Sequence, residues 1–209
     1  MTHPVPTRER IVRAARRLFA ERGYRGTSVG DIEAAAGLSP RSGALYKHFP
    51  SKRAVLEAVM AEHTEVVERI RSQLQLMPLG DLRAELTLIA RWSLAELRRE
   101  HELTRIVMKE GDRFPELAAA FRDAIVVRGH RAASEWVAEY AARHGVQVED
   151  PEALGSLVID SLVGYTLEEL LFGPSHPTGV DEDRFIAAWV QATEATVNSL
   201  IEERSPAHA

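Results

Sequence analysis

Apolar residues recur every three or four positions along most of the chain, a spacing that predicts amphipathic helices. In residues 7–22, for example, Ile11, Ala15 and Leu18 share one helix face, and Gly23 follows where a helix commonly ends. We find no convincing strand and no internal repeat, so the expected fold is all-α, with about nine helices. Their expected ranges are 7–22, 28–36, a third short helix within 37–52, then 51–76, 81–99, 102–110, 115–144, 151–172 and 181–204.

Residues 37–52, GLSPRSGALYKHFPSK, combine turn-forming residues with Leu45, Tyr46, Phe49 and several basic side chains. The small residues at 34–37 just before them would let two helices cross closely. Three short helices with such a crossing fit a helix-turn-helix, in which the third helix enters the major groove of DNA. The stretch is therefore predicted to hold a recognition helix.

Charge is distributed unevenly over the 209 residues, although the net charge is only −5. Residues 1–53 carry 11 Lys and Arg against 4 Asp and Glu, whereas the rest carries 15 against 27. This asymmetry indicates that only the first part meets a polyanion. It also has a simpler explanation, because Arg is common throughout the chain.

Several classes of function find little support in the residues. Cysteine is absent, which excludes disulfides and thiol chemistry, and no apolar run approaches the roughly 18 residues of a membrane span. We see no signal peptide and expect a cytoplasmic protein with no membrane partner. His101-Glu102 begins like a zinc-protease motif, but Arg105 stands where the second His is needed. We therefore expect no cofactor, no metal and no enzyme activity.

One family resemblance is specific. Residues 27–56, TSVGDIEAAAGLSPRSGALYKHFPSKRAVL, together with Ile11, Leu18-Phe19 and Gly23-Tyr24 upstream, closely resemble the DNA-binding domain of the tetracycline-repressor (TetR) family of bacterial regulators. The resemblance implies a helix-turn-helix domain over residues 1–52 and a ligand-binding and dimerisation domain over 53–209. It also implies a homodimeric transcriptional regulator, most often a repressor, which a small ligand releases from a palindromic operator.

The resemblance and the residue chemistry together suggest which side chains meet double-stranded DNA. Thr27 and the start of the second helix would hold one phosphate, and Tyr46 and His48 would reach others. Lys52 opposes the dipole of its own helix, a mild cost that a nearby phosphate would explain. The full candidate set is Thr27, Ser28, Ser39, Arg41, Ser42, Gly43, Tyr46, Lys47, His48 and Lys52.

The chain departs from the family pattern at one place. Nine steps separate Gly37 from Tyr46, where the family usually has about seven, so two residues are added before Leu45. Either Ser39 caps a recognition helix lengthened from Pro40, or the turn is longer and Ser42 is the cap. Both place Arg41 near the DNA, where it would contact a guanine or a phosphate.

The acidic remainder has two expected roles. The last two helices are apolar over more than one stripe, which favours a dimer interface over burial within one subunit. Its candidate residues are Leu154, Leu157, Leu162, Tyr165, Phe185, Trp189, Thr193 and Val197. The middle helices would enclose a small, partly apolar effector, although such residues are more often plain core. The candidates there are His63, Trp92, Glu96, Met108, Phe121, Trp136 and Tyr140.

Two other interpretations remain open at this point. The protein could be a DNA-binding factor without an effector, controlled by a partner or acting on DNA architecture. It could also be an all-helical binding or catalytic domain in which the basic N-terminal part is incidental.

Overall fold

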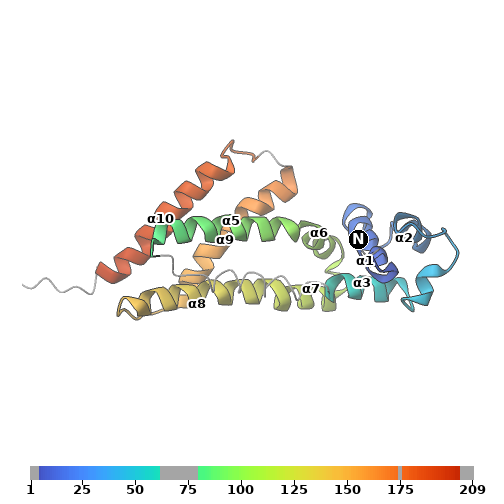
Figure 1. Ribbon diagram of the computed structural model, residues 1–209, viewed down its shortest axis with the longest axis horizontal. Coiled ribbons are helices and arrows are strands. Elements are labelled where there is room, and N and C mark those ends of the chain that lie inside the picture. Colours follow the sequence, from blue (N-terminus) through green and yellow to red (C-terminus); the bar gives the residue numbers. More distant parts are fainter. Residues whose placement is uncertain (1–4, 62–79, 174–175, 203–209) are drawn as a thin grey trace, which may run out of the picture. The chain divides into compact units, whose positions relative to one another are not determined.

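The computed structural model describes residues 5–61, 80–173 and 176–202, and every regular element in these ranges is helical (Figure 1). The chain divides into two compact units. The first comprises Met1–Glu65 and Glu100–Ile125, and the second comprises Val66–Arg99 and Val126–Ala209. Each unit is described on its own below.

The first unit joins the N-terminal helices to two later ones. It contains α1 (Thr7–Arg22), α2 (Val29–Ala35), the 3₁₀ helix η1 (Ala44–Lys47), α3 (Lys52–Ala61), α6 (His101–Glu110) and α7 (Pro115–Phe121). All six helices contribute to one apolar core, in which Phe19, Ile32 and Leu45 are buried together with Leu103 and Ile106. Because α6 packs on α1 and α7 packs on α3, two helices that the sequence placed in the second domain share a core with the first three. The domain boundary after residue 52 stays a prediction.

The second unit is built from long helices. It contains α5 (Leu82–Arg99), α8 (Val127–Arg143), α9 (Pro151–Phe172) and α10 (Glu182–Glu202). Leu86, Leu94 and Leu162 form its core with Trp189, whose indole N–H donates to the Val158 carbonyl at 3.0 Å. The five-residue π helix η2 (Arg122–Val126) lies between α7 and α8 and spans the division between the two units.

Most helix ends that the structure describes lie within two residues of the predicted ranges. Asp150 caps α9 by accepting the Ala153 N–H at 2.9 Å, with Pro151 in the first turn, and Gly145 takes a left-handed φ of 72° after α8. Two expectations were wrong. The helix predicted over 115–144 is interrupted by η2, and the recognition segment is a four-residue 3₁₀ helix rather than an α-helix. The part of the fourth predicted helix beyond residue 61 lies outside the described residues.

Candidate DNA-binding surface

Thr27 serves the fold of the first unit. Its side chain is fully buried, and its hydroxyl donates to the carbonyls of Gly23 at 2.9 Å and Leu18 at 3.2 Å. These bonds tie the loop after α1 to the last turn of that helix. The expected contact between the Thr27 hydroxyl and a phosphate does not fit this geometry, because the oxygen is already committed and is shielded from solvent.

The start of α2 is closed by a reciprocal cap. Ser28 accepts the Asp31 N–H at 3.1 Å, and the Asp31 carboxylate accepts the Ser28 N–H at 2.8 Å. The Ser28 hydroxyl also donates to this carboxylate at 2.5 Å, and these bonds hold the pKa of Asp31 below its usual range. A carboxylate therefore already sits where a phosphate was expected, and its charge opposes a second anion.

Lys52 also points into the unit. Its Nζ donates to the carbonyls of Tyr24 at 2.7 Å and Thr27 at 2.8 Å, and it lies 4.1 Å from the centre of the Tyr24 ring. Burial lowers the pKa of this lysine. The side chain clamps the α1–α2 loop onto α3, so the expected phosphate contact of Lys52 does not fit the structure either.

The two added residues form a turn before η1. Ser42 N–H donates to the Ser39 carbonyl at 3.3 Å, and Ser42 Oγ accepts the Ala44 N–H at 3.3 Å. Arg41 and Gly43 both adopt positive φ, 60° and 71°. The structure thus has the longer turn and contradicts a recognition helix lengthened from Pro40, but the residue at the N-cap of η1 is Gly43 rather than Ser42.

An exposed polar row follows this turn. Tyr46, Lys47 and His48 are exposed, and the Tyr46 side chain is 57% accessible, whereas Leu45 and Phe49 on either side are buried. The buried pair holds the segment in register against the core, which leaves the three polar side chains directed outward. Together with exposed Arg41, they offer phenol, imidazole and cationic donors to a polyanion.

The predicted effector residues are only partly brought together. In the second unit Trp136 stacks on Tyr140, with ring centroids 5.6 Å apart, and burial raises the pKa of Tyr140. Glu96 is buried and pairs with Arg99, while Trp92 is partly buried. Met108 and Phe121 lie in the first unit, Met108 exposed and Phe121 against its core, and His63 lies outside the described residues.

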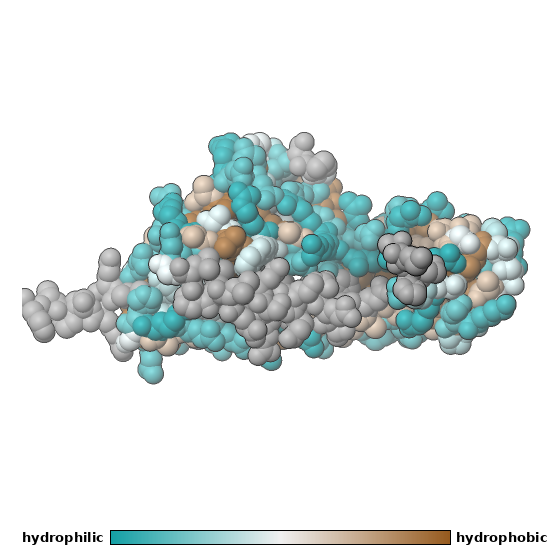
Figure 2. All heavy atoms as spheres, in the orientation of Figure 1, coloured by the Kyte–Doolittle hydropathy of each residue, from teal (hydrophilic) through white to brown (hydrophobic). Residues whose placement is uncertain are grey.

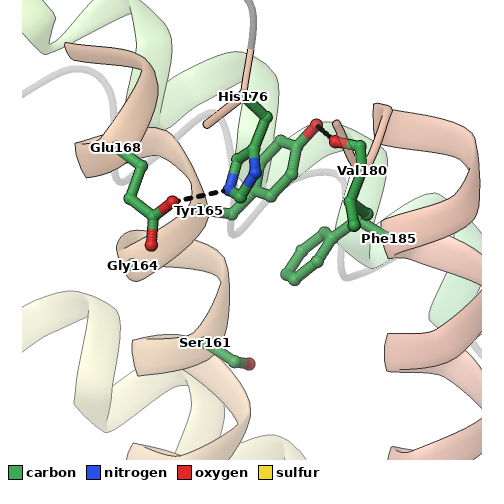
Figure 3. Close-up of a pocket in the computed structure, with 7 residues that line it drawn as sticks. All are labelled: Ser161, Gly164, Tyr165, Glu168, His176, Val180 and Phe185. Atoms are coloured by element: carbon green, nitrogen blue, oxygen red, sulfur yellow. Dashed lines mark hydrogen bonds and ion pairs between the residues drawn. The ribbon is translucent and has the colours of Figure 1, made fainter. Parts of the chain in front are cut away.

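The structure forms a hollow that the sequence did not indicate. It has a volume of about 280 Å³ and lies beside α9, α10 and the loop between them (Figure 3). Tyr165 stacks between His176 at 4.6 Å and Phe185 at 4.2 Å, and Glu168 pairs with His176 Nε2 at 2.9 Å. Tyr165 and Phe185 were predicted only for a dimer interface. The loop residues, which complete the hollow, follow no periodic pattern that could have revealed it.

Most of the predicted interface residues are core. Leu162, Tyr165, Trp189, Thr193 and Val197 are at most 6% accessible in a single protomer, so they have almost no surface to offer a partner. Leu154 and Phe185 are half-buried. Of the predicted set Leu157 alone is open, at 71% accessibility.

A different face of α9 is exposed. Leu157, Ser161, Gly164 and Leu171 recur at helical spacing along it and are all exposed, with the charged Glu168 between the last two, and Phe172 beside them is 69% accessible. Figure 2 shows apolar patches interrupting the polar surface in the region of α5, α9 and α10. Which of these residues form a dimer interface stays a prediction.

The described ranges contain neither a candidate metal site nor a membrane-spanning helix. No three His, Cys, Asp or Glu side chains there are grouped to hold a metal ion. Within the same ranges, no helix has both the length and the apolar character needed to cross a bilayer.

Within the first unit, α1, α2 and η1 with an outward-facing basic and aromatic segment after the turn have the arrangement of a helix-turn-helix DNA-binding protein. Residues 11–59 match the family model of bacterial regulatory proteins of the tetR family, and residues 84–196 match the C-terminal domain of AefR-like transcriptional repressors. The chain belongs to the TetR family of transcriptional regulators.

Relatives and solved structures agree with this membership over nearly the whole chain. The transcriptional regulator UidR of Escherichia coli K12 is 26% identical over 208 residues, which cover 96% of this chain and 95% of UidR. Salmonella enterica GusR superposes with a TM-score of 0.60 at 26% identity, covering 97% of this chain and 98% of GusR. The flavonoid-responsive regulator FrrA gives 0.64 at 25% identity, with 92% and 95% covered.

Proposed function

We propose that the protein is a homodimeric repressor that binds a palindromic operator and is released by a small, partly apolar effector. The exposed row Tyr46, Lys47 and His48 beside Arg41 carries the proposal, because it lies on the element that enters the major groove in helix-turn-helix proteins. The fold and the family support a role in transcriptional regulation, and these four side chains are the proposed DNA-binding surface.

The four side chains have different tasks in this proposal. Tyr46, Lys47 and His48 bind phosphates and set the register on the duplex, while Arg41 reads a guanine edge with its two-pronged guanidinium. Arg41 suits this task because it is exposed in the turn before η1.

Dimerisation supplies the second half-site. A single recognition segment reads few base pairs, so palindromic operators are bound by dimers whose segments lie about 34–36 Å apart. The exposed stripe Leu157, Ser161, Gly164 and Leu171 on α9 supports this, since its small residues permit close helix approach and its leucines supply apolar area. Leu157→Glu should give a monomer of unchanged helicity, read by light scattering after size-exclusion chromatography and by circular dichroism. A Leu157→Glu protein that stays dimeric would place the interface elsewhere.

The effector is proposed to be a small aromatic compound. The stacked Trp136 and Tyr140 offer flat apolar faces, and the buried Trp136 indole N–H has no hydrogen-bond partner among the residues that the structure describes. Such a donor favours a ligand with an oxygen acceptor. Because FrrA is described as flavonoid-responsive, flavonoids are a sensible first set of compounds for a thermal-shift screen.

Footprinting on the DNA upstream of the protein's own gene tests DNA binding directly. We expect a protected palindrome, and we expect Lys47→Ala to weaken binding and to reduce the slope of log affinity against log salt by about 1. Arg131→Ala removes one positive charge from the exposed surface of α8 and is the matched control. No protection at low salt would refute DNA binding, while a footprint that no compound releases would favour a factor without an effector.

A further inference from the structure

We propose that Gly30 and Glu33 on α2 determine the base preference of the protein without contacting DNA, because they fix the shape of the turn that presents Arg41. Gly30 makes room for the Arg41 stem, and Glu33 caps the first turn of η1. Both are positioning residues. This inference rests on the proposed DNA-binding function and adds to it the residues that set specificity.

The turn before η1 has to be stabilised by contacts from outside the turn. Arg41 has a φ of 60°, a left-handed conformation that is unfavourable for a residue with a Cβ. The bonds within the turn are few and long, the two at Ser42 both measuring 3.3 Å. A strained residue persists only where its surroundings over-determine it, so the contacts between this turn and α2 decide its geometry.

Gly30 is the first of these contacts. A Cβ placed on Gly30 would lie 3.2 Å from Cγ of Arg41 and 3.8 Å from its backbone nitrogen. The missing side chain thus leaves the space in which the base of the Arg41 side chain sits. Adding a methyl group would push Cγ outward by a few tenths of an ångström, and the displacement grows along the side chain toward the guanidinium.

Glu33 is the second contact. It is fully buried, and its Oε1 accepts the N–H of Leu45 at 3.0 Å. The first amide groups of a helix have no partners within the helix, and here a carboxylate from another helix supplies one. The second oxygen, Oε2, is buried and has no hydrogen-bond partner within the described part of the chain. Burying this carboxylate is costly, and the cap on η1 is the one hydrogen bond that its side chain makes among the described residues.

Together the two contacts fix the position of residues 41–45 against α2. Gly30 lies in the first turn of α2 and Glu33 lies one turn later, so they meet the segment at Arg41 and Leu45 respectively. The residues between these two contacts, 42–44, complete the turn. A change at either point therefore alters where the Arg41 guanidinium lies relative to the exposed row at 46–48.

The experiment is selection from a library of random duplex DNA with the full-length protein, followed by sequencing of the bound fraction. Gly30→Ala is compared with wild type, with Arg41→Ala, and with the double variant. Gly129→Ala is the matched control, because a Cβ on Gly129 in α8 would meet no atom of the described residues within 4 Å. Melting temperatures are recorded for every variant.

We expect Gly30→Ala to change the relative preference at one base position in each half-site by about fivefold or more. The same substitution in the Arg41→Ala background should change nothing, and Gly129→Ala should match wild type. If Gly30→Ala does not fold but Gly30→Ala with Arg41→Ala does, the steric contact is confirmed by stability instead. An unchanged preference for Gly30→Ala, or an equal change in both backgrounds, overturns the role of Gly30.

Glu33 is tested with a pair of substitutions. Glu33→Gln keeps an oxygen that can accept the Leu45 N–H and should retain the wild-type preference. Glu33→Leu fills the space without an acceptor and should broaden the preference while the helical content is kept. Equal profiles for both variants and wild type would refute the role of Glu33. If wild-type protein enriches no sequence, the proposed DNA-binding function fails and this inference falls with it, whereas enrichment without any effect of these variants overturns the inference alone.

Discussion

Replacing Gly155 with Ala tests the packing of α8 on α9, which builds one side of the second unit. A Cβ on Gly155 would lie 2.6 Å from the backbone nitrogen and from Oγ of Ser134, and 2.7 Å from its Cα. Ordinary contacts begin near 3.4 Å, so the methyl group would be about 0.8 Å too close. Ser134 Oγ could rotate away, but the backbone atoms cannot, and the helices would have to separate locally.

The size of the effect follows from two opposing contributions. Overpacking that moves the backbone costs about 1–3 kcal/mol, and this clash with two backbone atoms belongs at the upper end of that range. Ala is favoured over Gly inside a helix by up to about 1 kcal/mol, which offsets part of the cost. We expect a net loss of about 2 kcal/mol in the free energy of unfolding. For a chain of this length that lowers the melting temperature by about 4–8 °C.

The assay is thermal unfolding followed by circular dichroism at one fixed protein concentration, because the melting temperature of a dimer depends on concentration. Gly129→Ala is the control, since it carries the same helix-propensity gain without a clash and should melt at or slightly above wild type. A Gly155→Ala protein as stable as Gly129→Ala would show that α8 and α9 do not approach as closely as the structure places them.

Three further predictions concern the first unit. Arg41→Ala should weaken specific DNA binding by about 1–3 kcal/mol and relax the preference at one base position; a loss that is equal for all sequences, measured by competition binding, would assign Arg41 to a phosphate. Thr27→Val should cost about 1–3 kcal/mol in the free energy of unfolding, because it removes buried hydrogen bonds, while DNA affinity well below the melting temperature stays the same. Thr27→Ser keeps the hydroxyl and is its control, and weaker DNA binding at unchanged stability would restore the phosphate role. Because Ser28 lowers the pKa of Asp31, the contribution of that carboxylate is present above the usual carboxyl range and is lost as the pH falls below about 4. Urea unfolding at pH 6 and pH 3 should therefore show a smaller acid loss for Asp31→Asn than for wild type, and equal losses would contradict the cap.

The helices and their ends were predictable because their signals are local. The cap at Asp150 and the left-handed Gly145 are each specified within a few residues of the sequence. The roles of Thr27 and Lys52 were not predictable in this way. Their hydroxyl and ammonium groups were expected on phosphates, but they bind carbonyls of the α1–α2 loop, and the contact of Lys52 spans 28 residues of sequence to Tyr24. A polar residue in a DNA-binding motif has the same sequence signature whether it binds the nucleic acid or supports the loop that does.

The conformation of residues 39–48 could not be predicted either, because it also depends on contacts with another helix. The two added residues were visible in the sequence, but their geometry depends on Gly30 and Glu33, which lie on another helix and read as an ordinary helical glycine and a solvated acid. A buried carboxylate in a short helix is a local inconsistency, and such inconsistencies mark positions where tertiary structure has overruled local preference.

Which helices form one unit is the property least visible in the chain. Lys109 near the end of α6 donates to the carbonyls of Ala20 at 2.5 Å and Glu21 at 3.0 Å, and Glu110 accepts the Tyr24 N–H at 2.7 Å. These two residues occupy the free carbonyls and the following amide at the C-terminal end of α1, which a helix otherwise leaves to water. The C-terminal end of α1 therefore depends for part of its hydrogen bonding on a segment 86 to 89 residues later in the sequence. The predicted boundary after residue 52 follows the sequence motif, whereas the core of the first unit also includes α6 and α7.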